Sequence, residues 1–126
     1  MNSFNLSRVL FPLFLVLIAG PGCDPAKKQL PPLPLDQIPA ALEKAFSKAE
    51  AENKELADSV AACVRSQDYS KAYASLEALL SKPKLNREQS EVTARSILTV
   101  NQALLEAQQK GDEAAAQALQ YNQKNR

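Results

Sequence analysis

Apolar residues recur at steps of three and four from Asp36 onward, which is the period of an amphipathic helix. No stretch alternates with a period of two, so we expect no β-strand. The first helix is predicted to begin at Asp36 as N-cap, to carry Pro39 in its first turn and to end near Ser66. Such a rod has roughly 29 residues and is ~43 Å long. Its apolar stripe consists of Ile38, Leu42, Ala45, Phe46, Ala49, Leu56, Val60, Cys63 and Val64.

Two further helices are separated by a proline. Asp68 is an N-cap candidate for a helix that ends at Leu80, because Pro83 prevents its continuation. Asn86 and Gln89 have the spacing of a capping box and predict the start of the third helix. We expect Leu98 and Leu105 to widen the apolar face of that helix, which is formed by Val92, Ile97, Val100, Leu104 and Ala107.

The last helix is predicted to be short. Gly111 has the position of a left-handed C-cap, and Asp112 can cap a fourth helix that reaches about Tyr121. Residues 122–126 are expected to be a frayed tail. The pattern therefore predicts an all-α domain over residues 36–121, a small bundle of three to four helices with antiparallel hairpins.

The predicted helix lengths are unequal, and this isolates part of the first helix. The second helix, about 12 residues and ~18 Å long, can pair only with the later half of the first. Ile38, Leu42 and Phe46 would then lack a partner within the chain. We expect them either to form an interaction surface, for self-association or for a partner protein, or to be covered by a bend near Glu52 and Asn53.

The N-terminal segment has the pattern of an export signal. Its start contains one basic side chain, Arg8, and an apolar run of 11 residues follows from Val9 to Ala19. A membrane span needs about 20 residues, whereas a run of this length is typical of a signal peptide. We therefore interpret residues 1–22 as a signal peptide.

The residues after this run, Gly20-Pro21-Gly22-Cys23, resemble the lipobox of bacterial lipoproteins. The resemblance implies that Cys23 becomes the first residue of the mature chain and carries a lipid on its thiol. The membrane, inner or outer, would then be a partner through this anchor, in the bacterial cell envelope. Residues 23–35 hold four of the eight prolines and would act as an extended linker. The alternative is ordinary signal cleavage with a free or disulfide-bonded Cys23.

A second resemblance lies in the helical part. Asp68-Tyr69-x-x-Ala72-x-x-x-Leu76, followed by a proline, is similar to the second half of a tetratricopeptide repeat, over about residues 53–84. The resemblance implies an antiparallel helical hairpin and a protein-binding, non-catalytic role.

Composition narrows the chemistry. The 126-residue chain has a net charge of +1, which argues against nucleic acid as a partner, and it has no histidine. The commonest general base and metal ligand is therefore missing. Cys63 lies on an apolar face, so we expect a buried free thiol or, alternatively, an intermolecular disulfide. The acidic pairs Glu52/Glu55 and Glu88/Glu91 are expected on salt-bridged surfaces, with a weak calcium site as the alternative.

The sequence therefore favours a non-catalytic, membrane-anchored envelope lipoprotein that acts through protein–protein contacts. We expect no enzyme activity, no cofactor, no metal and no small-molecule substrate. The alternatives are a small envelope inhibitor, a ligand-binding protein with a cleft between helices, or a structural spacer. The basic cluster Lys82-Pro83-Lys84 and Arg87 could touch anionic lipid or cell-wall polymers, but four such charges on a neutral domain more often serve only loop solubility.

Overall fold

The computed structural model describes residues 30–125. Within this range the chain is helical and contains no strand, which confirms the predicted all-α class. A short 3-10 turn, η1 (Leu35–Gln37), leads into α1 (Ile38–Ala45) and α2 (Ala51–Arg65). The chain continues through α3 (Tyr69–Leu80), α4 (Arg87–Gln109) and α5 (Glu113–Lys124).

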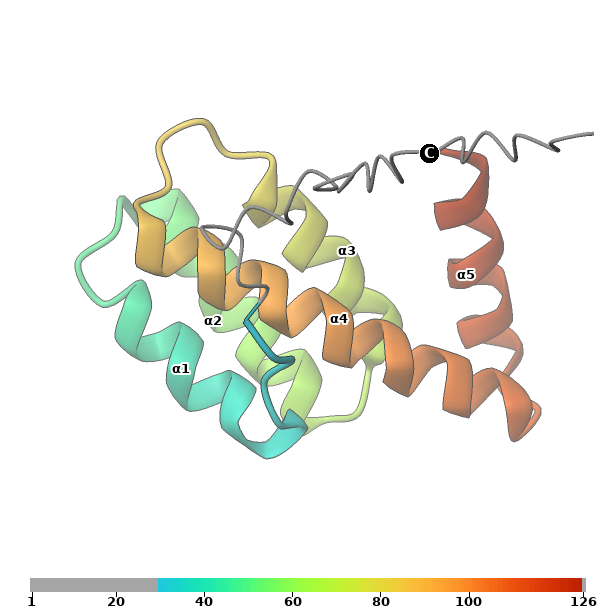
Figure 1. The fold of residues 1–126 in the computed structure, drawn as a ribbon. Coiled ribbons are helices and arrows are strands. Elements are labelled where there is room, and N and C mark those ends of the chain that lie inside the picture. Colours follow the sequence, from blue (N-terminus) through green and yellow to red (C-terminus); the bar gives the residue numbers. More distant parts are fainter. Residues whose placement is uncertain (1–29, 126) are drawn as a thin grey trace, which may run out of the picture.

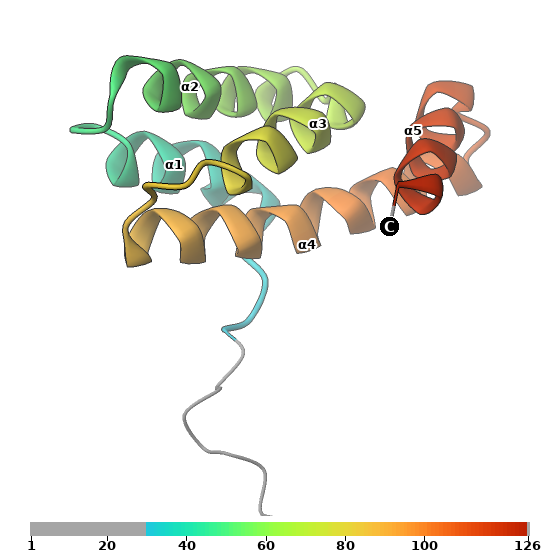
Figure 2. The same ribbon diagram turned by 90° about the horizontal axis from the view of Figure 1, so that it is seen from above.

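Helices α1 to α4 form a ring in which each helix packs against the next and α4 closes on α1 (Figure 1). Their facing sides bury a common core, whose fully buried large members include Ile38, Leu42, Phe46, Val60, Leu76, Leu79 and Val100. Helix α4 is the longest and extends beyond this ring, as Figure 2 shows. Helix α5 packs on the extended end of α4 and also contacts α3.

The prediction of a single long helix from Asp36 to Ser66 is wrong. The chain forms two helices, α1 and α2, joined by a turn over residues 46–50, a few residues before the expected bend. Breaking one turn gives up roughly four helical hydrogen bonds, each worth about 0.5–1.5 kcal/mol net. The fold-back buries Ile38, Leu42 and Phe46, and each such side chain is worth about 1.5–3 kcal/mol. Burial therefore outweighs helix continuity.

Side-chain caps form at three of the four helix starts that the sequence predicts. The Asp68 side chain accepts from the backbone N–H of Lys71, and Asn86 and Gln89 form a complete capping box. Asp112 accepts from the N–H groups of two residues in the first turn of α5. Asp36 is the exception, because it lies in η1 and caps no helix.

Both ends of the domain differ from the predicted boundaries. Helix α5 continues to Lys124, so residues 122–124 are helical rather than frayed. At the other end, residues 30–34, which we term the N-terminal strap, lie against α4. The Leu33 side chain is 7% exposed and belongs to the core. The last part of the expected linker is therefore part of the folded domain.

Candidate functional site

The three residues proposed as an interaction surface are in the interior. Ile38 and Leu42 are 0% exposed and Phe46 is 1% exposed. The turn after α1 places this helix between α2 and α4, so the chain covers its own stripe. The expectation of a free surface at these residues is therefore wrong, and a break in the helix covers them instead.

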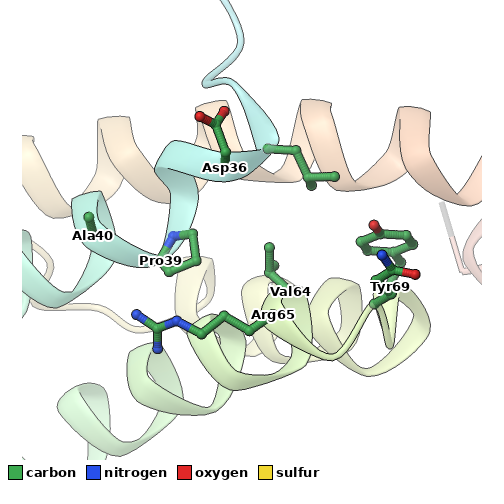
Figure 3. Close-up of a pocket in the computed structure, with 8 residues that line it drawn as sticks. Asp36, Pro39, Ala40, Val64, Arg65 and Tyr69 are labelled. Atoms are coloured by element: carbon green, nitrogen blue, oxygen red, sulfur yellow. The ribbon is translucent and has the colours of Figure 1, made fainter.

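A shallow groove of about 470 Å³ lies where η1 and the start of α1 meet the α2–α3 connection (Figure 3). The Arg65 guanidinium borders it but donates to the Glu43 carboxylate at 2.7 Å. The groove is therefore a mainly apolar surface with its cation already paired. Its lining residues are Leu35, Asp36, Pro39, Ala40, Val64, Arg65, Gln67 and Tyr69.

A second open hollow, of about 360 Å³, lies between α3 and α4. It is lined by Tyr73, Glu77, Leu80, Ser81 and Ile97. The Leu80 side chain is 45% exposed, whereas Tyr73 is 2% exposed and forms the floor. This combination offers an apolar contact with one acidic side chain at its rim.

Two leucines of α4 point away from the core, contrary to expectation. Leu98 is 54% exposed and Leu105 is 37% exposed. At 100° per residue these two positions lie within about 20° of each other, while Val100 and Leu104 lie roughly 100–160° away on the core side. We call Ala94, Leu98 and Leu105 the outer strip of α4. The spacing shows that Leu98 and Val100 lie on different faces, but only the burial of Val100 and Leu104 shows which of the two faces is the core.

One carboxylate of each acidic pair is engaged in an ion pair. Glu52 accepts from Lys82 of the α3–α4 loop, and Glu91 accepts from Arg87 at 2.7 Å. The hydrogen bond and charge of Glu91 raise the pKa of Arg87 above its ordinary value. Among residues 30–125 no three His, Cys, Asp or Glu side chains group as a metal site would require. These contacts also neutralise two cations of the basic cluster.

Cys63 and the tyrosines differ in how far their side chains are buried. Cys63 is a free thiol, partly buried against the core rather than fully buried. Of the tyrosines, Tyr73 is in the core and Tyr121 is 69% exposed. The chain has no histidine, the side chain that most often acts as the base for such a thiol.

The predicted lipidation residue, Cys23, lies outside the described residues, as do the signal peptide and most of the linker. Within residues 30–125, no helix combines the length and the apolar composition that crossing a membrane requires. Comparison of the chain with protein-family models, with curated proteins and with solved structures finds no match.

Proposed function

We propose that this chain is a lipoprotein of the bacterial cell envelope, anchored to a membrane through Cys23, whose helical domain acts through protein–protein contacts without catalysis. The observation that carries the proposal is the apolar run Val9–Ala19 followed directly by Gly20-Pro21-Gly22-Cys23. Gly20 and Pro21 stand where lipoproteins usually have Leu and then Ala or Ser, so processing at Cys23 is the step to test first.

Protein contacts are supported by the surface of the helical domain. The two hollows are shallow and open, and the interior of the ring is filled by apolar side chains. Ligand sites are typically concave cavities that enclose most of the ligand. The exposed Leu80 beside the hollow between α3 and α4 instead provides an apolar contact that a protein partner can cover. This favours contacts with proteins over the alternative of a ligand-binding cleft.

Metabolic labelling with radioactive palmitate tests the anchor. The wild-type chain should incorporate label and Cys23→Ser should not, while Cys63→Ser, which removes the other thiol, should label like the wild type. Equal labelling of all three, or of none, would contradict the anchor. The intact mass of the native protein then reports the cleavage site and the acyl chains together.

Crosslinking in intact cells followed by mass spectrometry tests the protein-contact part. We expect crosslinked partners to be enriched over an unrelated lipoprotein control and to be reduced by Leu80→Glu. Recovery of only background proteins from the anchored wild type would contradict this part while leaving the anchor intact.

A further inference from the structure

The chain leaves the helical ring across α4. The Arg95 Nε donates to the Pro31 carbonyl at 2.7 Å, and the Thr99 hydroxyl donates to the Leu33 carbonyl. The buried Leu33 side chain fixes the strap between these two bonds and η1. In Figure 2 the chain before α1 runs out from the α4 side of the ring, away from α2. The exit point is therefore set by α4.

Three of the five large apolar side chains that are exposed among residues 30–125 lie on the strap or on α4. Among residues 30–125, the large exposed hydrophobic side chains are those of Leu30, Leu80, Leu98, Leu105 and Tyr121. None of them lies on α1 or α2. Leu30 belongs to the strap, and Leu98 and Leu105 belong to the outer strip of α4.

Exposed charged side chains are more numerous on α2 than around Leu98 and Leu105 of α4. Around Leu98 and Leu105 the exposed or half-exposed polar neighbours are mostly amides, at Asn101, Gln102, Gln108 and Gln109. The charged neighbours there are Arg95, which is bound to a strap carbonyl, and Glu106. At the Ala94 end of the strip lies Glu91, which is paired with Arg87. Helix α2, which is diagonal to α4 in the ring, exposes Glu52, Lys54, Glu55, Asp58 and Arg65. Covering the part of the outer strip from Leu98 to Leu105 therefore removes fewer charges from water than covering α2.

We propose that the outer strip of α4 lies against the surface of the lipid bilayer in which the chain is anchored. This inference rests on the anchor at Cys23 proposed above. Seven Cα steps separate Cys23 from Leu30 and reach at most about 25 Å. Two packed helix layers are already about 20 Å thick. Reaching the α2 side would use about 20 of these 25 Å for the thickness of the ring alone, before the detour around its edge. The strap therefore favours the α4 side as the side that faces the bilayer.

The interfacial layer of a bilayer is chemically suited to this strip. Leucine side chains enter the boundary between headgroups and acyl chains, while amide side chains hydrogen-bond with headgroups and ester carbonyls. Two leucines bind a bilayer weakly by themselves, so the contact depends on the anchor to hold the strip in place.

A single tryptophan can report the orientation, because the chain has none. The chain from Cys23 to Arg126, carrying Cys63→Ser, is coupled through Cys23 to a maleimide lipid in vesicles of phosphatidylethanolamine and phosphatidylglycerol. Leu98→Trp and Leu105→Trp place the probe on the outer strip, and Ser59→Trp places it at an exposed position of α2 as the matched control. Brominated phospholipids quench tryptophans that lie near the bilayer.

We expect quenching of the Leu98→Trp and Leu105→Trp variants to exceed that of Ser59→Trp at least twofold, and to vanish when the chain is not coupled to lipid. Equal quenching, or stronger quenching at Ser59→Trp, would overturn the inference. A blue shift of the outer-strip tryptophans that rises with protein concentration without vesicles would assign the strip to a second copy and also overturn it. Because the coupling is chemical, the result is independent of whether cells acylate Cys23.

Discussion

At the residue scale, the Gln89 side chain connects two helices. Its Oε1 accepts from the N–H of Asn86 and completes the capping box of α4, while its Nε2 donates to the carbonyl of Ala45 at the end of α1. The second bond satisfies one of the carbonyls that every helix leaves unpaired at its C-terminus. Gln89, which forms the capping box of α4, therefore also caps the C-terminal end of α1.

The double role of Gln89 leads to a prediction. Gln89→Glu keeps the acceptor of the capping box but loses the donor to Ala45 and places a carboxylate beside a helix C-terminus. We expect the free energy of unfolding to fall by about 1–2 kcal/mol in urea denaturation. Gln117→Glu, an exposed position of α5, adds the same charge and should change it by less than about 0.5 kcal/mol. A Gln89→Glu variant as stable as the wild type would show that the bond to Ala45 contributes nothing.

Two residues with left-handed backbone conformation within the described range form a matched pair. Gln67 has φ +62° and Gly111 has φ +91°, and each ends a helix with the bonds of a Schellman motif. At Gln67, which ends α2, the side chain makes this conformation costly, whereas a glycine adopts it freely. A Cβ at Gly111 would meet no atom within 4 Å, so only the backbone conformation opposes a side chain there.

Removing the side chain at Gln67 and adding one at Gly111 should therefore change the free energy of unfolding in opposite directions. Gln67→Gly is expected to raise the free energy of unfolding by about 0.5–1 kcal/mol, and Gly111→Ala to lower it by about 1 kcal/mol. Chemical denaturation of the two variants beside the wild type measures both. A loss of stability in Gln67→Gly would contradict the assignment of strain to that residue.

At the scale of elements, the strap behaves as a structural element although it contains no helix or strand. Its carbonyls are bound by side chains of α4 that lie more than 60 residues later in the chain, and Leu33 completes the core. Proline suits this segment because it has no N–H that would need a partner. The sequence indicates an extended conformation here but not the surface that the segment contacts.

Two substitutions in the strap test whether this segment packs on α4 or extends freely into solvent. Leu33→Ala should lower the free energy of unfolding by about 2–3 kcal/mol, because it empties a buried position. Leu30→Ala, where the side chain is 42% exposed, should change it by less than about 0.5 kcal/mol. Thermal melting followed by circular dichroism compares them. Equal melting temperatures for Leu33→Ala and Leu30→Ala would mean that the strap does not pack on α4 in solution.

At the scale of the whole molecule, stability should be distributed unevenly. Helices α1 to α4 each contact two neighbours in the ring, whereas α5 contacts the end of α4 and part of α3. Only Ala115 and Leu119 of α5 are buried. The ring can therefore retain its core when α5 detaches.

Native-state hydrogen exchange should show this difference. We expect the amides of α5 to exchange through local opening at least 1 kcal/mol below the global free energy of unfolding, and those of α2 and α3 to exchange only through global unfolding. Leu119→Ala should accelerate exchange in α5 while leaving α2 and α3 protected. Uniform protection of all five helices would contradict the ring with an attached helix.

The sequence by itself determined the all-α class, the ends of α3, the starts of α4 and α5, and the left-handed turn at Gly111. These features depend on hydrogen bonds between residues two to five apart, so the local sequence contains all the groups involved. Only the tertiary structure decided the break after Ala45, the docking of the strap and the exposure of Leu98 and Leu105. Those features depend on contacts such as Gln89 with Ala45 and Thr99 with Leu33, 44 and 66 residues apart. Which face of a helix is buried depends on the neighbouring helices that it contacts, and helical periodicity alone does not specify those neighbours.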